Sequence, residues 1–367
     1  MKRGAHIDRP LALIIAILVV GGCMIFASAA FGLLARGATH MSSVVFSHLA
    51  LGVGLGLVAL VIGTTLDYRI WKKYAPHLFV LALVATALVF VPQIGFSHGG
   101  GTRWLHIAGI SLQPSEGLKL AAVIAAAAYF SLIKTKVSTF TYGFGGFLAI
   151  LSLPVLLLLL QPDTGTLGII AISVTAVFFA AGASWKQIGA TILIGIMALV
   201  LLATFRPYVK DRIMTFFNPS QNQQTESYQL RQSLIAIGSG GFMGRGFGQG
   251  IQKFTYLPEP MGDSIFAVAA EELGFIGSSL IVLLFAAFAL RGYAVASRAP
   301  DLFGSLLAVG ISTYLASEAF INIAAMLGAF PLTGVPLTFI SQGGSAMLVS
   351  LGAAGILLAI SRRHARA

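Results

Sequence analysis

The stretch QKFTYLPEPMGDSIFAVAAEELGFIG, residues 252–277, lies where a long polar loop meets an apolar helix. Pro258 and Pro260 exclude a helix interior before it, and Asp263 or Ser264 is a favourable N-cap for the helix that follows. The pattern therefore predicts a carboxylate fixed at the start of a membrane helix. That carboxylate is either a simple cap or a functional group, and the rest of the chain decides between the two.

Composition sets the class of the protein. Of the 367 residues, 57% are hydrophobic and only 10% are charged, with a mean hydropathy of +0.90. Soluble domains carry about 25% charged residues, so the chain is an integral membrane protein. The single cysteine, Cys23, excludes a disulfide framework. The apolar run around it continues to Leu34, which favours an uncleaved first helix over a signal segment.

Apolar runs long enough to cross a membrane recur along the chain, since a span needs about 20 residues. We predict ten transmembrane helices, near residues 11–34, 43–65, 77–92, 114–133, 142–160, 164–182, 187–205, 265–290, 302–328 and 339–361. The fold class is all-α, a single polytopic membrane domain over 1–367, with residues 206–262 as a large extracytoplasmic loop between helices 7 and 8.

The basic residues predict the orientation. Fourteen of the 23 Lys and Arg residues flank the helices on one side: Lys2, Arg3, Arg9, Arg69, Lys72, Lys73, Lys134, Lys136, Lys186, Arg291, Arg298, Arg362, Arg363 and Arg366. The short loops opposite contain only Arg36 and Arg103. Positive loops face the cytoplasm, so both termini are predicted to be cytoplasmic. The net charge of +11 is then mostly topology and not a sign of nucleic-acid binding.

The acidic residues have the opposite distribution. Only Asp8, Asp67 and Asp301 lie on the cytoplasmic side, and the other nine lie in outward loops or in and near helices. An ionisable group inside a membrane costs about 2.5–3.5 kcal/mol on insertion scales and is a functional candidate by default. We therefore predict a polar site at the outward face.

Two outward segments are candidates for that site. Residues 93–113 contain a glycine-rich turn and Trp104, and lead into PSEGLK, where Glu116 and Lys119 share one helix face, either as a structural ion pair or as cavity residues. The second segment, 206–262, is too long for a connector. It contains an amphipathic helix predicted at about 225–237 and then the glycine-rich run 238–250.

The glycine-rich run is not a nucleotide loop. It lacks GxxxxGK followed by Ser or Thr and lacks a preceding strand, and the chain has no D-x-D pair for a metal-bound sugar nucleotide. Arg231, Arg245 and Lys253 surround it. They predict an outward basic patch that binds either a phosphate or pyrophosphate, or anionic lipid.

From Arg103 onward the chain resembles the SEDS family (FtsW, RodA, SpoVE) of polytopic peptidoglycan glycosyltransferases. Five stretches carry the resemblance: GTRWLHIAGISLQPSEGLKL (101–120), QPDTGT (161–166), YQLRQSLIAIGSGGFMGRGFGQGIQK (228–253), LPEPMGDSIFAVAAEELG (257–274) and NIAAMLGAFPLTGVPLTFISQGGS (322–345). The form DRIMTFFNP (211–219) and the QK before LPEP are closer to the division branch, FtsW, than to the elongation branch.

The resemblance implies a reaction and its residues. Such enzymes polymerise lipid II at the outer face of the bacterial cytoplasmic membrane, and Asp263 falls on the position of the catalytic aspartate, a general base. Cations would stabilise the leaving pyrophosphate. The implied substrate-binding residues are Arg103, Trp104, Glu116, Lys119, Asp163, Ser233, Arg245, Lys253, Glu259, Ser341, Gly343, Gly344 and Ser345.

The resemblance also implies partners. They are the growing glycan strand, a class B penicillin-binding protein that acts as transpeptidase, and other division or elongation membrane proteins, with no nucleic acid. No cofactor is implied with certainty, although a divalent cation, Mg²⁺ or Mn²⁺, could act at the pyrophosphate.

This sequence departs from the family pattern near the aspartate. The family commonly reads HTDF, whereas Met261, Gly262 and Ser264 flank Asp263 here, so any assistance from that histidine or threonine is absent. Further along, Thr338 replaces a common proline and Gln342 a common tyrosine, and Glu318 stands mid-helix where an amide is expected.

Two other function classes fit the composition. A flippase or transporter of lipid-linked oligosaccharide would also bury acids in an apolar bundle, but transporters often show internal repeats, and no convincing repeat joins the two halves. A non-catalytic scaffold for division or elongation enzymes would use Asp263 only as a cap.

Overall fold

The computed structural model describes residues 7–35, 45–98, 101–107, 110–217 and 226–362. Within these ranges nine helices are long and apolar enough to cross a membrane, and a tenth apolar helix is shorter. The helices are α1 (Arg9–Ala35), the π-helix η1 (Ser47–Gly54) continuing as α3 (Leu55–Thr65), α4 (Arg69–Ala87) with a 3₁₀ end η2 (Leu88–Phe90), α5 (Pro114–Ile133), η3 (Lys134–Lys136), the π-helix η4 (Phe140–Phe144) continuing as α6 (Gly145–Leu160), α7 (Thr164–Ala180), α8 (Trp185–Phe205), α9 (Pro207–Phe217), α10 (Glu226–Ser239), α11 (Gln252–Thr255), α12 (Ile265–Ser297), α13 (Leu302–Met326) and α14 (Gly344–Ser361).

The predicted all-α membrane fold is confirmed, and the helix limits differ in a systematic way. Helix α4 begins at Arg69 and not near residue 77, and α12 continues to Ser297, because helices extend past their apolar parts into polar ends. Conversely, α14 begins only at Gly344, since residues 339–343 form an irregular segment in which Phe339, Ile340 and Ser341 are buried. The sixth predicted span, 164–182, is α7, which has 17 residues.

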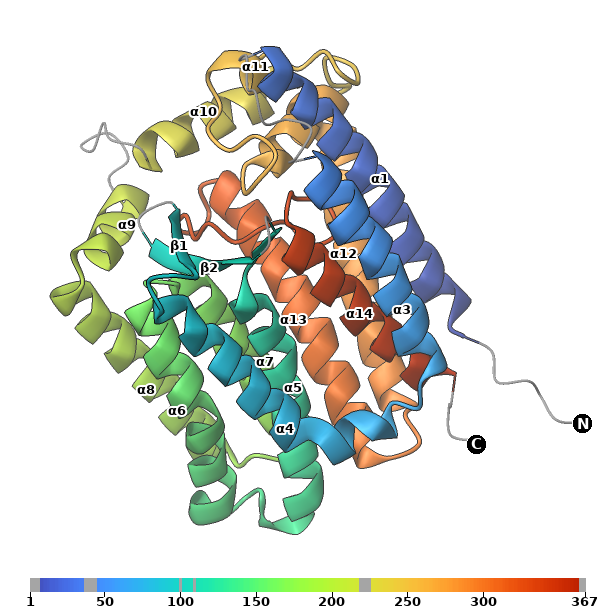
Figure 1. Cartoon of the computed structure of the whole chain (residues 1–367), viewed down its shortest axis with the longest axis vertical. Helices are drawn as coiled ribbons and strands as arrows, with labels where there is room; N and C mark the ends of the chain where they lie inside the picture. Colours follow the sequence, from blue (N-terminus) through green and yellow to red (C-terminus); the bar gives the residue numbers. More distant parts are fainter. Residues whose placement is uncertain (1–6, 36–44, 99–100, 108–109, 218–225, 363–367) are drawn as a thin grey trace, which may run out of the picture.

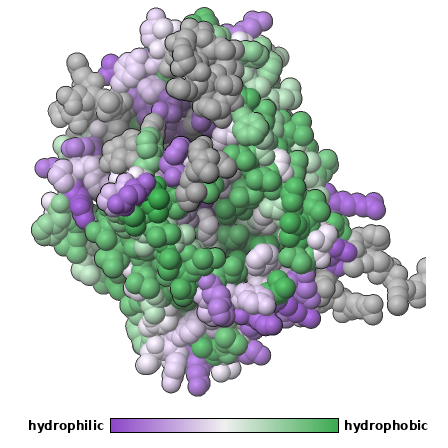
Figure 2. All heavy atoms as spheres, viewed as in Figure 1, coloured by the Kyte–Doolittle hydropathy of each residue, from purple (hydrophilic) through white to green (hydrophobic). Residues whose placement is uncertain are grey.

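Helix α13 lies at the centre of the bundle. It contacts α5, α7 and α12, and most of its apolar span is buried (Figure 1). Helix α8 is the opposite case, since no residue of its apolar window is buried, and Figure 1 shows it at the outer edge of the bundle. Figure 2 shows a hydrophobic belt across the middle of the molecule with hydrophilic residues above and below it, as expected of a protein that spans a membrane.

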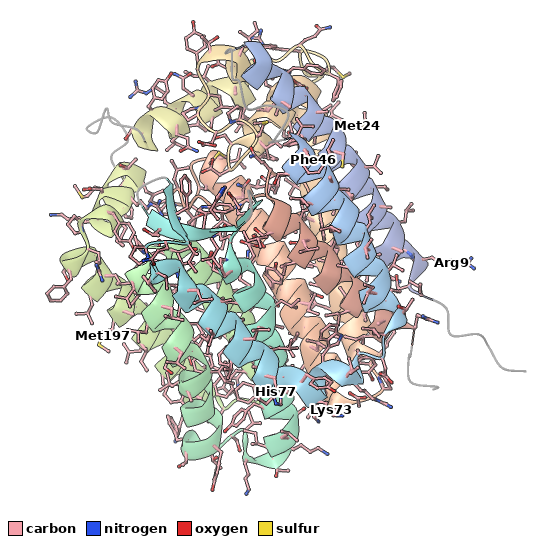
Figure 3. All side chains as sticks on the ribbon, in the orientation of Figure 1. Arg9, Met24, Phe46, Lys73, His77 and Met197 are labelled. Atoms are coloured by element: carbon pink, nitrogen blue, oxygen red, sulfur yellow. The ribbon has the colours of Figure 1, made fainter. Side chains whose placement is uncertain are left out.

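Residues near the two ends of the described chain, and two of the loops between helices, lie together at one end of the bundle. Asp8 accepts a bond from Arg291 at 2.6 Å and its amide donates to Ser361 Oγ at 3.0 Å. Arg69 pairs with Asp301 at 3.1 Å. Arg9, Lys73 and His77 lie at this end, away from α10 and α11, whereas Met24 and Phe46 lie nearer those helices (Figure 3). Several of the basic residues that predict the cytoplasmic side therefore lie at the same end of the helix bundle: Arg9, Arg69, Lys73 and Arg291.

The opposite end has structure that the sequence did not predict. Strands β1 (Gly95–His98), β2 (Gly101–Ile107) and β3 (Ile110–Leu112) form an antiparallel sheet in the order β1-β2-β3. The segment predicted as a large loop, 206–262, contains the helix predicted at about 225–237, which is α10, and two helices that were not predicted, α9 and α11. In Figure 1, α10 and α11 lie at the top of the molecule, and α9 lies at the left, at about the height of the sheet.

Helix α12 is broken at Gly274, whose φ of +66° suits glycine. A Cβ there would lie 2.2 Å from the Gly244 amide nitrogen, so only glycine allows the glycine-rich loop to approach this closely. The break frees backbone groups of the helix to bond with that loop: the Glu271 carbonyl accepts from Arg245 N at 3.0 Å, and Phe275 N donates to the Gly241 carbonyl at 2.8 Å. The glycine-rich loop is therefore docked on α12.

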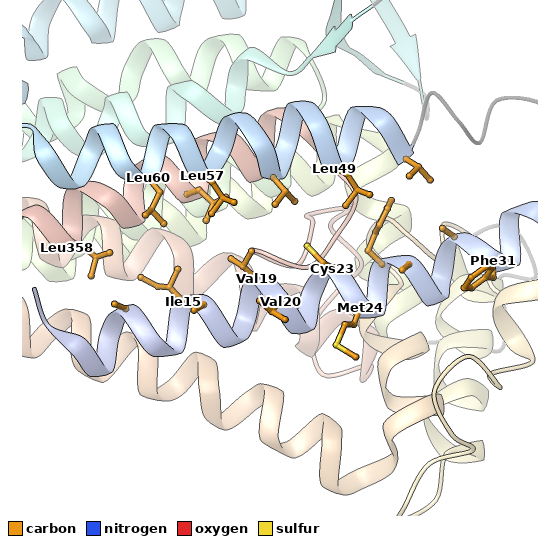
Figure 4. Close-up of a pocket in the computed structure, with 18 residues that line it drawn as sticks. Ile15, Val19, Val20, Cys23, Met24, Phe31, Leu49, Leu57, Leu60 and Leu358 are labelled. Carbon is orange, nitrogen blue, oxygen red and sulfur yellow. The ribbon is translucent and has the colours of Figure 1, made fainter.

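A groove of about 790 Å³ lies between α1 and the helical pair η1 and α3 (Figure 4). Its lining is entirely apolar and includes Ile15, Val19, Cys23, Leu49 and Leu57. Because both walls belong to membrane spans, this surface is of the kind that lipid chains contact.

Candidate functional site

The backbone around Asp263 forms a tight turn before α12. Glu259 has a φ of +44°, which is strained for a non-glycine residue, and its carbonyl accepts bonds from Gly262 N at 3.0 Å and Ser264 N at 3.3 Å. Ser264, one of the two predicted candidates, occupies the N-cap position of α12, but it makes no side-chain capping hydrogen bond. The Asp263 side chain is left for another role.

Two distant segments hold this turn in place. Asn322 of α13 donates from Nδ2 to the carbonyls of Asp263 and Val335, both at 2.8 Å. Ser341 donates from Oγ to the carbonyl of Gly262 at 2.7 Å, and Gln342 N donates to the carbonyl of Met261 at 2.7 Å. A carboxylate on a backbone fixed from two sides has little freedom to move, which favours a precise chemical role.

The Asp263 carboxylate is partly buried and accepts a hydrogen bond from a side chain of α10. Gln229 of α10 donates from Nε2 to Asp263 Oδ1 at 3.1 Å and to Ser264 Oγ at 3.0 Å. Burial raises the pKa of Asp263 to about 6; the Glu259 charge adds to the rise, while the Gln229 bond and the Arg212 charge oppose it. A carboxylate with a pKa this close to neutrality is suited to general base catalysis.

Arg103 and Asp163 organise the QPDT turn, residues 161–164. Arg103 of β2 donates from Nε to the carbonyl of Gln161 at 3.3 Å and from its second nitrogen to the carbonyl of Pro162. Asp163 caps α7 by accepting from Thr166 N at 3.2 Å. Trp104 is half-buried and pairs with Phe96 across the sheet. In this conformation these predicted substrate residues position the outward end of α7.

Lys119 lies inside the bundle between two carboxylates. Its Nζ lies 2.9 Å from Glu116 Oε2 and 2.6 Å from Glu318 Oε1, and all three side chains are at most 2% exposed. The ring of Tyr314 lies 5.2 Å from the same ammonium group. Glu318 therefore has a partner that the sequence did not reveal, and the ion pair predicted within α5 extends to α13.

The glycine-rich loop is held by two neighbouring carboxylates of α12. Glu272 accepts from Lys253 at 2.5 Å, while Glu271 accepts from Ile251 N at 2.9 Å and lies 3.5 Å from Arg245. Lys253 is fully buried and also donates to Ser28 Oγ at 2.7 Å, whereas Arg245 is 38% exposed. The prediction of Lys253 as part of an outward basic patch is therefore wrong, because the lysine points into the protein.

Most of the remaining predicted residues make contacts within the protein. Ser233 is buried and contacts Met326 Sδ at 3.4 Å, and Ser345 Oγ accepts from Gln113 N at 3.2 Å. Gly343 is the N-cap of α14, and Gly344 lies against Ser47. Glu259 is exposed beside Asp263, so of this group it alone reaches the surface near the carboxylate.

Sequence reasoning missed three residues that act on Asp263. Gln229 and Asn322 are uncharged amides 34 and 59 residues away, with no local signal of their role. Arg212 could have been noticed, since it lies in the stretch DRIMTFFNP within a basic part of the outward loop.

Comparison with known proteins supplies the family. A family model for FtsW, RodA and SpoVE, described as a cell cycle protein, matches residues 9–366. The chain belongs to the FtsW/RodA/SpoVE family. Stage V sporulation protein E of Bacillus subtilis is 39% identical over 309 residues, covering 84% of each chain. A probable peptidoglycan glycosyltransferase FtsW of Geobacter sulfurreducens is also 39% identical, over 84% of this chain and 83% of the relative.

Solved structures of FtsW/RodA/SpoVE proteins have the same fold. A chain from a structure titled "Structural coordination of polymerization and crosslinking by a peptidoglycan synthase complex" has a TM-score of 0.77 at 25% identity, covering 98% of both chains. The rod shape determining protein RodA of Thermus thermophilus has a TM-score of 0.70 at 24% identity over 98% of both chains, which supports the fold alone. The resemblance noted from the sequence is thus confirmed over nearly the whole chain.

Proposed function

We propose that this FtsW/RodA/SpoVE protein is a peptidoglycan glycosyltransferase that polymerises lipid II into glycan strands at the outer face of the cytoplasmic membrane. The observation that carries the proposal is Asp263, a partly buried carboxylate with a pKa near 6 on a turn braced by Asn322 and Ser341. Curated relatives with 39% identity include one named as a probable peptidoglycan glycosyltransferase. Identity is equal for that FtsW relative and for the sporulation protein, so assignment to the FtsW branch stays a prediction.

The proposed reaction forms one glycosidic bond. The 4-hydroxyl oxygen of a GlcNAc attacks the anomeric carbon of the MurNAc at the end of the growing chain. Asp263 takes the hydroxyl proton, and the bond to the pyrophosphate oxygen breaks with its electron pair, which releases undecaprenyl pyrophosphate. Positioned base catalysis contributes about 10²–10⁴-fold, so charge stabilisation of the leaving group must contribute as well.

The leaving group requires cations, and the protein's own side chains are the first candidates. Lys119 and Lys253 are held by buried carboxylates, which leaves the arginines of the outward face as the accessible groups. Among the residues described, no three His, Cys, Asp or Glu side chains gather as metal ligands. Mg²⁺ is commonly held by only one or two carboxylates together with substrate phosphates, so a divalent cation at the pyrophosphate stays a prediction, and no step is assigned to it.

The partner is inferred from the same resemblance. The structure titled as a peptidoglycan synthase complex couples polymerisation with crosslinking, and its chain shares this fold at 25% identity. We propose that this protein acts with a class B penicillin-binding protein, which would crosslink the strands as they form.

The test is polymerisation of purified lipid II by the purified chain, with and without that transpeptidase. Long glycan strands would support the proposal. Translocation of lipid II across vesicles without polymer would instead favour the flippase. Stimulation of a different polymerase, with neither activity of its own, would favour the scaffold.

Cysteine labelling tests the proposed orientation. In a Cys23→Ser background, Met243→Cys should react with an impermeant thiol reagent in whole cells, because residue 243 is 80% exposed in the outward loop. The matched control is Trp185→Cys, 79% exposed at the start of α8 near the opposite end, which should react only after permeabilisation. The reverse pattern would overturn the topology.

The pH dependence of polymerisation follows from Asp263. Its pKa is raised to about 6, and the base must be ionised, so turnover should fall about tenfold per unit as the pH drops below 6. The effect of pH on stability has the opposite sign. Because the pKa of Asp263 is raised in the folded state, protonation of Asp263 stabilises the fold. This stabilisation is fully present below about pH 4 and is lost as the pH rises through about 6. A pH–rate profile without a limb near 6, with the chain still folded, would contradict the assignment.

A further inference from the structure

Helix α13 carries a row of buried polar side chains along one face. Tyr314, Glu318 and Asn322 recur every four residues, so they lie one helical turn apart on the same face. All three are at most 1% exposed. Polar groups this deep in an apolar bundle cost free energy unless other groups satisfy them, so their partners indicate what the row does.

Glu318 attaches α13 to α5. Its Oε1 accepts a hydrogen bond from Lys119 Nζ at 2.6 Å, and the ring centroid of Tyr314 lies 5.2 Å from the same nitrogen. In the part of the chain that the structure describes, the other carboxylate oxygen of Glu318 has no hydrogen-bond partner. The charge-assisted bond to Lys119 is therefore the contact through which Glu318 acts.

Asn322, one turn further along α13, holds the turn that carries Asp263. Its Nδ2 donates to the carbonyls of Asp263 and Val335, both at 2.8 Å. The place of that turn therefore depends on the place of α13, which the bond between Glu318 and Lys119 fixes against α5. A shift of about 1 Å in a reacting group can cost about 10²-fold in rate, even when its cause lies far from the chemistry.

We propose that Glu318 is a positioning residue for Asp263, an inference that rests on the proposed function. The carboxylate fixes α13 to Lys119, and Asn322 transmits that position to the backbone of the Asp263 turn. Glu318 acts through the protein and not on the substrate. This role also accounts for the sequence departure at residue 318, because the amide expected there has an oxygen that can accept the same bond from Lys119.

The first test is the kinetics of strand synthesis from lipid II by purified full-length Glu318→Met. This variant removes the acceptor, while Lys119 keeps Glu116 at 2.9 Å, so no buried charge is left without a partner and the chain should fold. We expect kcat to fall about 10- to 100-fold and KM for lipid II to change less than about threefold, because the base and not the binding of substrate is misplaced. An unchanged kcat in folded Glu318→Met would overturn the proposal.

Glu318→Gln is the conservative variant. Its amide oxygen can still accept the bond from Lys119, so kcat should stay within about threefold of the wild type. A fall as large as that in Glu318→Met would show that the charge and not the bond matters, and would overturn the positioning role.

Thr313→Val is the matched control on the same helix. It removes a buried hydroxyl that donates to the Val309 carbonyl at 2.8 Å and lies 3.1 Å from the Tyr293 hydroxyl of α12. Because the bond between Glu318 and Lys119 stays in place, kcat should change less than about twofold. Equal losses in Thr313→Val and Glu318→Met would overturn the proposal, since any lost polar contact of α13 would then have the same effect.

A double variant tests the route through Asn322. In an Asn322→Ala background the contact between α13 and the Asp263 turn is already lost, so Glu318→Met should lower kcat by less than about a further twofold. Losses that add in full would show that Glu318 does not act through Asn322, and would overturn the proposal.

Hydrogen exchange gives a readout that does not require polymerisation. The amides of Gly262 and Ser264 donate to the Glu259 carbonyl, so exchange in peptides that cover residues 259–264 reports on the turn. Exchange there should become at least about threefold faster in Glu318→Met and stay unchanged in Thr313→Val. If Glu318→Met does not melt cooperatively, Glu318→Leu takes its place, and if Asn322→Ala does not, this exchange comparison decides.

The outcomes distinguish this inference from the proposed function. Faster exchange at residues 259–264 in Glu318→Met, without polymerisation by the wild type, would leave the positioning role and remove the polymerase. Polymerisation by the wild type, with both kcat and exchange unchanged in Glu318→Met, would do the reverse.

Discussion

Asp263→Asn should insert, fold and bind its partner, yet make almost no glycan from lipid II. The amide is isosteric with the carboxylate and can still accept the bond from Gln229, but it cannot take a proton at the working pH. The turn is held by bonds to the carbonyls of Gly262 and Asp263, which the substitution leaves intact. We expect a loss of about 10²–10⁴-fold in turnover, the range for a positioned base. The measurement is strand synthesis by the purified variant from purified lipid II.

The thermal melt is the control that makes this loss interpretable. Ionised Asp263 is disfavoured in the folded state at neutral pH, because burial raises its pKa to about 6, so Asp263→Asn should melt no lower than the wild type. Asp211→Asn is the matched variant, since it removes an exposed carboxylate of α9 that is not among the implied site residues, and it should keep most of the activity. If Asp263→Asn made glycan strands in wild-type yield, Asp263 would not be the catalytic base, and the scaffold and flippase functions would again be the alternatives.

The helices and the Asp263 turn could be predicted because their signals are local. Membrane insertion sums hydropathy over about 20 residues, so errors at single positions average out, and in the part of the chain that the structure describes the ten apolar runs appear as nine long helices and one shorter one. Asp263 is noticeable because Pro258 and Pro260 end helix formation just before a long apolar run. The antiparallel sheet at residues 95–112 was missed, since its glycines indicate a turn and its strands are short.

Side-chain partners could not be predicted, because they depend on how distant segments pack. No feature of the sequence near Glu318 predicts its contact with Lys119, 199 residues away, and none near Gln229 predicts its contact with Asp263. Lys253 is the clearest failure. In sequence it follows a glycine-rich loop and looks solvated, but the break of α12 at Gly274 docks that loop on the helix, and the lysine enters a pocket closed by Glu272 and Ser28.

Lys253→Met should lower stability more than any other single change in the outward loop. Lys253 is fully buried, and its ammonium group bonds to Glu272 at 2.5 Å, to Ser28 Oγ at 2.7 Å and to the Gly248 carbonyl at 3.1 Å. Removing one partner of a buried ion pair leaves the other charge uncompensated and costs about 3–5 kcal/mol. Methionine fills a similar volume, so the loss is electrostatic and not a cavity effect. The measurement is the melting temperature in detergent, which should fall by at least about 5 °C.

Two further variants separate a buried pair from a general requirement for positive charge. Arg245→Met removes a charge from the same loop, but Arg245 is 38% exposed and 3.5 Å from Glu271, so it should cost at most about 1 kcal/mol. The double variant Lys253→Met with Glu272→Gln removes the stranded carboxylate and should recover much of the lost stability, because neither charge then remains buried. If Lys253→Met melts with the wild type, Lys253 does not stabilise the folded state and is available to a ligand after all. If the double variant is no better than the single one, the loss comes from packing, and the electrostatic account of the docked loop fails.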